Sequence, residues 1–135
     1  MSKNKLILFI SFMVAALLSI LGLYFFQQTI SKVMPYNRQE ISRICITDGN
    51  NGKMIDLEEN EIDLLYEELK LIDKKKTSLE ESTGWGYDVV IFADNKTMDI
   101  VIISPNVWEI DNRSYNITNN MGEKIYNDIK YMMEE

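Results

Sequence analysis

The feature that most constrains this chain is an uninterrupted apolar run from Leu6 to Phe26, which contains no charged residue. Its only members outside the apolar set are Ser11, Ser19 and Gly22. As a helix the run would be about 31 Å long, which matches a bilayer hydrocarbon core of about 30 Å. Serine hydroxyls can bond back to a helix backbone, and Tyr24 suits the membrane interface. We therefore predict one membrane-spanning helix over 6–26 that contacts the lipid bilayer.

The orientation of this helix depends on its flanks. Lys3 and Lys5 precede the run, but basic residues also follow it, so the positive-inside rule does not decide. A short basic tail before a long apolar run is typical of a signal anchor, which puts residues 1–5 in the cytoplasm and the later residues outside. A cleaved signal peptide stays an alternative, although the run is long and lacks an Ala-x-Ala site. A reversed anchor with a cytoplasmic domain is the other alternative.

The rest of the chain has a different composition. Apolar residues make up 46% of the whole sequence, but the N-terminal run holds a disproportionate share of them. The residues after Phe26 carry 12 basic and 21 acidic side chains, and this balance argues against a nucleic-acid partner. One cysteine excludes a disulfide scaffold, and the absence of histidine excludes any mechanism that needs one. No cofactor is expected.

A small α+β domain is predicted after the membrane helix. Pro35 lies in a polar stretch, so 27–39 is expected to form a stalk and 40–135 the domain. Strands are expected over 41–47, 53–55, 85–93, 97–104, 107–110 and 113–117. Asp56 with Glu59 predicts a capped amphipathic helix that runs to Ile72. The polar segment 73–84 is expected to be a loop, and the end of the chain a second amphipathic helix. Hairpin connections imply an antiparallel sheet with both helices on one face, in the order β-β-α-β-β-β-β-α.

The turn after the first expected strand is a first candidate site. Four residues fall at positions 1, 3, 9 and 12 of an EF-hand calcium loop: Asp48, Asn50, Asp56 and Glu59. However, Lys53 occupies the position at which the loop needs glycine, and the preceding segment is β-branched, not helical. A β-turn that leads into a capped helix is the favoured alternative, and calcium binding stays a minor one.

Aromatic residues on the expected hairpins form a second candidate site: Trp85, Tyr87, Trp108 and Tyr115. On one exposed face they would make a recognition patch for a protein partner. Packing beneath the helices is the alternative, and it is favoured because aromatic residues in strands mostly build the core.

The acidic residues and the single cysteine suggest two further chemistries. Acidic residues concentrate around the first helix, where they suit a solvated face or a basic partner. A carboxylate-based enzyme acting on envelope polymers would need two acids across a cleft.

Arg43 lies two residues from Cys45 and would lower the pKa of its thiol. A structural role for the cysteine is favoured, however, because the chain lacks histidine and a second cysteine.

Four features carry a resemblance: the strand at 41–46, the Gly-Asn turn, the Asp-Leu-Glu-Glu helix start at 56–59 and the Lys-Thr-Ser stretch at 76–78. In these the chain resembles small membrane-anchored or lipoprotein domains of unknown function from low-GC Gram-positive bacteria, although the lipoprotein cysteine is absent. The resemblance implies no activity. We therefore expect a non-enzymatic, single-pass membrane protein whose domain binds a protein at the membrane or envelope. A carboxylate enzyme and a calcium-binding domain remain the alternatives.

Overall fold

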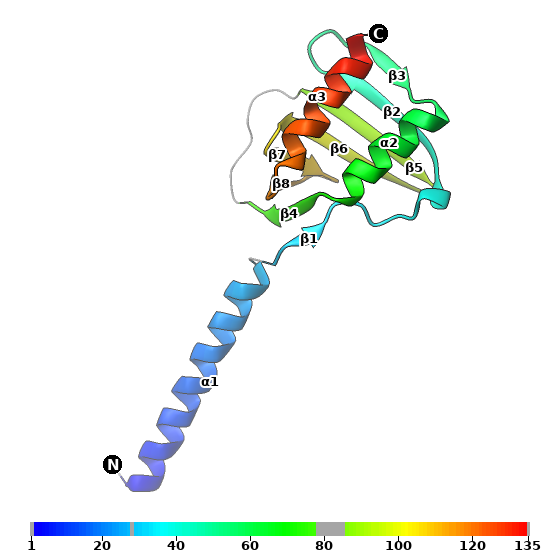
Figure 1. The fold of residues 1–135 in the computed structure, drawn as a ribbon. Helices are drawn as coiled ribbons and strands as arrows, with labels where there is room; N and C mark the ends of the chain where they lie inside the picture. Colours follow the sequence, from blue (N-terminus) through cyan, green and yellow to red (C-terminus); the bar gives the residue numbers. More distant parts are fainter. Residues whose placement is uncertain (1, 28, 78–85, 135) are drawn as a thin grey trace.

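The computed structural model describes residues 2–27, 29–77 and 86–134. A long helix, α1 (Lys3–Gln27), precedes a domain in which eight strands form one antiparallel sheet and two further helices cover one of its faces (Figure 1). The predicted class, an apolar N-terminal helix followed by a two-layer α+β domain, is confirmed.

The helix α1 contains the apolar run. Its segment Lys3–Phe25 is, among the described residues, the one helix long and apolar enough to cross a membrane, and none of it is buried against the domain. Its apolar side chains point outward around the helix, with Leu8 75% exposed. Ser19 Oγ donates a hydrogen bond to the carbonyl oxygen of Ala15 at 3.0 Å, which satisfies the hydroxyl inside the helix itself. A helix that is apolar all round needs an apolar environment.

The sheet has the strand order β1-β4-β8-β7-β6-β5-β2-β3, and all neighbouring strands are antiparallel. The strands are β1 (Ser31–Lys32), β2 (Ile41–Asp48), β3 (Met54–Asp56), β4 (Asp73–Lys76), β5 (Tyr87–Ala93), β6 (Lys96–Ser104), β7 (Val107–Ile110) and β8 (Arg113–Ile117). Asp111 and Asn112 join β7 to β8 with φ values of 49° and 69°, which two-residue hairpins require. The hairpins predicted in the second half of the domain are both present.

The core lies between the sheet and the two helices α2 (Glu59–Lys70) and α3 (Met121–Glu134). A short 3-10 helix, η1 (Arg38–Glu40), leads into β2. The buried residues of each helix lie along one of its sides: Ile62, Leu65, Tyr66 and Leu69 on α2, and Gly122, Ile125, Ile129 and Met133 on α3. They pack on inward-facing strand residues such as Ile44, Ile91 and Ile100, which have no exposed surface. This one-sided pattern is why the two segments form helices on a sheet.

The domain begins earlier than the sequence predicts. The segment assigned to a stalk, 27–39, contributes strand β1, and Val33 and Met34 belong to the buried core. The backbone N–H of Val33 donates to the carbonyl oxygen of Ile72 at 3.1 Å. The helix α1 already ends at Gln27, well before Pro35, and the apolar pair ahead of the proline has surface to bury and therefore enters the core.

The predicted loop at 73–84 is wrong at its start, because Asp73–Lys76 form strand β4 between β1 and β8. A lysine-rich segment is a weak strand by propensity, but charged side chains are tolerated next to a sheet edge. Residues 78–84 lie outside the described residues. The domain order is therefore β-β-β-α-β-β-β-β-β-α, with two more strands than predicted.

The start of the first domain helix is also shifted. Glu58, not Asp56, is the N-cap of α2, and its capping-box partner is Glu61 instead of Glu59. Asp56 is the last residue of β3, where it is the register partner of Cys45. The capping pattern is real but is displaced by two residues, because pairing with β2 extends the strand through Asp56.

Candidate functional site

The residues of the calcium hypothesis do not converge. Asp48 Oδ1 accepts a hydrogen bond from the backbone N–H of Asn50 at 2.8 Å within the β2–β3 turn. Asp56 and Glu59 each form an ion pair with an arginine of another element. Within 2–27, 29–77 and 86–134, no group of three or more acidic, cysteine or histidine residues could hold a metal ion. The turn therefore fits the structural alternative, an Asx-type β-turn.

The aromatic residues pack in the core. Tyr87, Trp108 and Tyr115 are all buried on the helix-covered face, and Trp108 has no exposed surface. Trp108 and Tyr115 are register partners on β7 and β8, and Tyr87 meets Tyr126 of α3 edge to face at 5.3 Å between ring centres. Trp85 lies outside the described residues. The three described residues thus do not form an exposed recognition patch, and the packing alternative describes them.

The opposite face of the sheet carries no helix in the described part of the chain (Figure 1). We call it the open face. Its centre is an apolar strip of half-buried residues, Val90 and Phe92 on β5 and Val101 on β6. Arg43 of β2 lies beside this strip, with its guanidinium carbon 5.1 Å from the centre of the Phe92 ring. Apolar side chains left on a sheet face without a covering layer are typical of an interaction surface.

Acidic side chains flank this strip. Asp88 and Glu109 are the register partners of Val101 on its two sides, and Asp99 is the partner of Val90. Asp88 and Asp99 are therefore diagonal neighbours on adjacent strands. Desolvation by burial, a side-chain hydrogen bond with Asp99 and the charge of Asp99 together raise the pKa of Asp88 to about 7. One oxygen of Asp88, Oδ1, is buried and has no hydrogen-bond partner among the described residues.

Cys45 also points toward the open face but is only 8% exposed. Burial raises the pKa of its thiol, and the negative charge of Asp56 raises it further, while the charge of Arg43 opposes both. Arg43 alone would lower the pKa of this thiol, as expected from the sequence, but the net shift in the structure is upward. A thiol with a raised pKa is a poor nucleophile, which fits a structural role.

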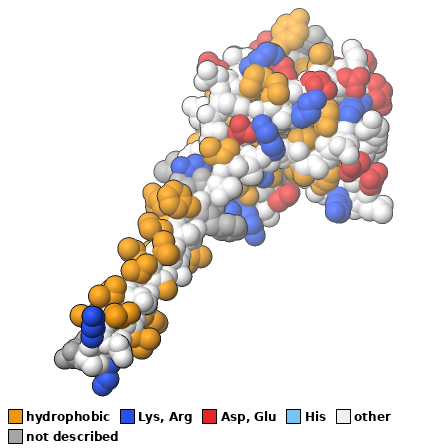
Figure 2. All heavy atoms as spheres, turned by 60° about the horizontal axis from the view of Figure 1, so that its bottom comes forward, with side chains coloured by type: hydrophobic (Ala, Val, Ile, Leu, Met, Phe, Trp, Pro, Cys, Tyr) orange, Lys and Arg blue, Asp and Glu red, His pale blue; other side chains and the backbone are white. Residues whose placement is uncertain are grey.

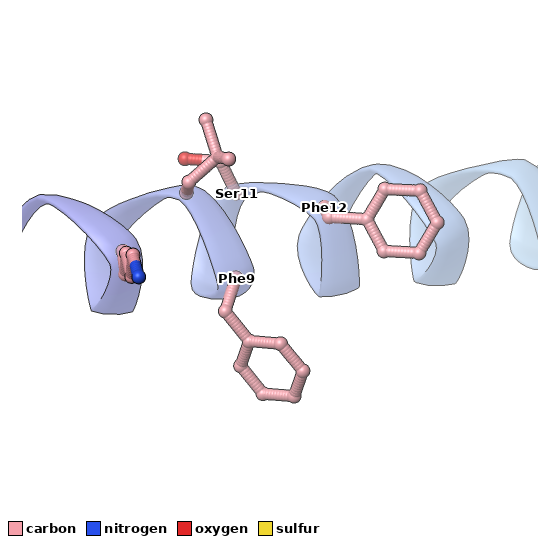
Figure 3. Close-up of a pocket in the computed structure, with 5 residues that line it drawn as sticks. Phe9, Ser11 and Phe12 are labelled. Atoms are coloured by element: carbon pink, nitrogen blue, oxygen red, sulfur yellow. The ribbon is translucent and has the colours of Figure 1, made fainter. Parts of the chain in front are cut away.

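Hollows at two other places carry no comparable chemistry. One is a groove between the start of α2 and the end of α3, where Leu64 and Tyr131 are exposed and Glu58 and Glu61 are engaged in the capping box. The other lies on α1 between outward-pointing side chains, and Figure 3 shows Phe9 and Phe12 projecting in different directions from the helix. Gaps of this kind on a single apolar helix are spaces between side chains that a lipid tail would fill.

The sequence alone does not point to the acidic pair of the open face, but the strand pattern around it carries a signal. Alternation of buried and half-buried residues along β5 places Asp88 on the same face as Val90 and Phe92. The hairpin that pairs Ala93 with Lys96 then sets Asp99 opposite Val90. The spacing of one acid on each strand therefore predicts a carboxylate pair, once the hairpin register is known.

Comparison of the chain with family models, curated proteins and solved structures finds no match. The open face and the apolar helix α1 are therefore the features that point to a function.

Proposed function

We propose that this chain is a single-pass membrane protein that holds a small acidic binding domain next to the bilayer, outside the cytoplasm. The open face would bind a protein partner. The observation that carries this proposal is the half-buried apolar strip of Val90, Phe92 and Val101, which no helix of the described residues covers and which acidic side chains flank. It predicts a partner with an apolar centre and basic residues at its rim, since opposite charges orient such contacts.

The helix α1 supports the membrane part of the proposal. It is long enough to cross a bilayer, is exposed on all sides, and has Lys3 and Lys5 at its start. A short basic tail before such a helix favours the cytoplasm for the tail and the opposite side for the domain. A tether of this kind raises the local concentration of the domain toward membrane-side partners, so a modest open-face affinity suffices.

The affinity of this binding should depend on pH. A partner lysine or arginine near Asp88 would favour the ionised carboxylate, and burial holds the pKa of that carboxyl at about 7. Binding would then release a proton from Asp88. Affinity should therefore fall as the pH falls below about 7, because the proton must first be removed from Asp88.

Photocrosslinking tests the binding face. A benzoylphenylalanine would replace Phe92 in the full chain in native membranes, and a matched control would carry it at Asn127, an exposed position of α3. We expect a discrete crosslinked protein from position 92 only, and its loss on charge reversal by Asp99→Lys. Equal crosslinking from position 127, or a product insensitive to Asp99→Lys, would contradict the proposal.

Thiol labelling tests the orientation. Asn127→Cys would be combined with Cys45→Ser, which removes the buried native thiol. A membrane-impermeant maleimide should label this variant in intact cells after removal of any cell wall. Labelling that requires lysis would place the domain in the cytoplasm and refute the orientation.

An enzyme is the second candidate, and the carboxylate pair favours it. A carboxyl group with a pKa of about 7 beside a second carboxyl is the pattern of a general acid with a general base or nucleophile. Hydrolysis of envelope polymers by the full chain, abolished by Asp88→Asn with the fold retained, would favour this candidate. Absence of such activity over pH 5–8 would count against it.

A further inference from the structure

We propose that one edge of the domain binds the headgroups of anionic phospholipids in the membrane that α1 crosses. This lysine edge is formed by two neighbouring strands and comprises Lys32 of β1 and Lys74, Lys75 and Lys76 of β4. The inference rests on the proposed membrane insertion of α1 and adds to it a second, electrostatic contact that fixes how the domain sits on the bilayer.

The chain places the lysine edge next to the end of the membrane helix. Only residues 28–30 separate α1, which ends at Gln27, from β1, which begins at Ser31. Four Cα–Cα steps span at most about 14 Å. Figure 1 shows β1 and β4 as the part of the domain beside the C-terminal end of α1, and Figure 2 shows basic side chains at this junction. If α1 inserts, the lysine edge must lie close to the headgroups.

The charge of the edge contrasts with that of the domain. The residues after Phe26 carry 12 basic and 21 acidic side chains, and the edge gathers four of the basic ones. Lys32 forms an ion pair with Asp73 at 2.7 Å, with its side chain still 62% exposed. Within the described part of the chain, neither Lys75 nor Lys76 pairs with a carboxylate. A local cationic surface on an acidic domain fits an anionic ligand.

The strand geometry suits a flat anionic surface. Lys75 lies opposite Asn116 and Lys76 opposite Tyr115, so their side chains leave β4 toward opposite faces of the sheet. Strand β1 pairs only with Asp73 and Lys74, which leaves the outer side of β4 without a partner strand at 75–76 among the described residues. Lysines that emerge on both sides of an edge can reach headgroups together when that edge faces the membrane. Anionic lipids attract juxtamembrane lysines in this way.

Protection of sheet edges offers a simpler explanation for the same lysines. Charged residues at an edge prevent pairing with other chains. That explanation predicts no dependence on lipid charge, which makes the two explanations separable by experiment.

Residue-resolved lysine acylation provides the test. The full chain would be reconstituted in vesicles of phosphatidylcholine alone or with about one third phosphatidylglycerol. It would then be treated with a water-soluble succinimidyl ester and analysed by mass spectrometry. We expect Lys75 and Lys76 to react at least roughly threefold more slowly with the anionic lipid, because a bound headgroup shields the amine, and 0.5 M salt should abolish the effect. Lys130, an exposed lysine of α3, is the internal control.

Further measurements distinguish lipid headgroups from free phosphate, and failure of headgroup binding from failure of membrane insertion. Inorganic phosphate added to phosphatidylcholine vesicles should protect nothing. The double variant Lys75→Gln/Lys76→Gln should lose the protection of Lys32, whereas Lys130→Gln should retain it. Equal reactivity in both lipid mixtures, with the chain floating with both, would overturn this inference and leave the anchor intact. Failure of the chain to float with vesicles would refute the anchor itself. Aggregation of the double variant without any lipid effect would support edge protection instead.

Discussion

Asp88 on β5 and Asp99 on β6 lie diagonally across neighbouring strands of the open face, and the pKa of Asp88 is raised to about 7 in this setting. Burial contributes most to the raised pKa of Asp88, and the hydrogen bond and negative charge of Asp99 add to it. Burial and a nearby negative charge both disfavour the ionised form of Asp88. The open face therefore changes its charge near neutral pH.

This pair makes domain stability depend on pH. The pKa of Asp88 is about 7 in the folded chain, and an unfolded aspartate has one near 3.9. The folded state then holds the proton more tightly, so the favourable contribution of protonated Asp88 is lost as the pH rises from about 4 to about 7. Urea midpoints of the full chain in detergent should show that Asp88→Asn raises stability at pH 8 more than at pH 5.5. Glu123→Gln, which removes an exposed acid of α3, controls for the loss of one charge. An identical effect of Asp88→Asn at both pH values would refute the prediction.

The start of α3 tolerates no side chain at Gly122. A Cβ there would meet the carbonyl oxygen of Pro105 at 2.2 Å and Ile117 Cγ2 at 3.1 Å. In an open helix position, Gly→Ala would stabilise by roughly 1 kcal/mol. Here we expect Gly122→Ala to destabilise the full chain by about 1–3 kcal/mol, since α3 must move off the sheet. Thermal or urea unfolding measures this, and Asn127→Ala on the exposed side of α3 should be neutral or slightly stabilising. A stabilising Gly122→Ala would show that α3 does not approach Pro105.

Arg38 holds η1 against α2. Its guanidinium donates to Asp63 Oδ1 at 2.6 Å, to Glu59 Oε2 at 2.7 Å and to the carbonyl oxygen of Ile41 at 3.2 Å. Lysine keeps the charge but cannot make this three-way fork, so Arg38→Lys should lose about 1 kcal/mol after allowance for solvent screening of the exposed carboxylates. Arg43→Lys is the matched control, because Arg43 is half exposed and binds one carboxylate, and it should lose less. Equal losses in urea unfolding would indicate that Arg38 contributes no more than a surface pair.

Much of the fold follows from local pattern. The β7–β8 hairpin was predicted because Asp111-Asn112 separates two β-rich runs, and α3 because Met121, Ile125 and Ile129 share one face. These signals are strong because the residues that form a turn, or that repeat along one helix face, are close together in the sequence. The inward packing of Trp108 agrees with the favoured alternative, because aromatic residues in strands mostly build the core.

What the sequence did not reveal depends on distant contacts. Asp73–Lys76 has weak strand propensity, and it becomes β4 because β8 pairs with residues 74–76 and β1 pairs with Asp73 and Lys74. The raised pKa of Asp88 requires the register of β5 against β6 and the burial of its side chain. Neither property can be predicted from the residue and its immediate neighbours, since each arises from a strand elsewhere in the chain.

The earlier start of the domain leads to a last prediction about Val33. This residue is 1% exposed, whereas Ile30, three positions before it, is 57% exposed. Val33→Ala removes two buried methyl groups and should cost about 2 kcal/mol in urea unfolding of the full chain, while Ile30→Ala should cost little. A fragment over 40–135, which corresponds to a domain without β1, should be less stable than one over 29–135 by at least as much. Equal stability of the two fragments, or of the two alanine variants, would show that residues 29–39 are a stalk outside the folded domain. The segment between membrane and domain would then be a spacer, and the lysine edge would lose its close connection to the bilayer.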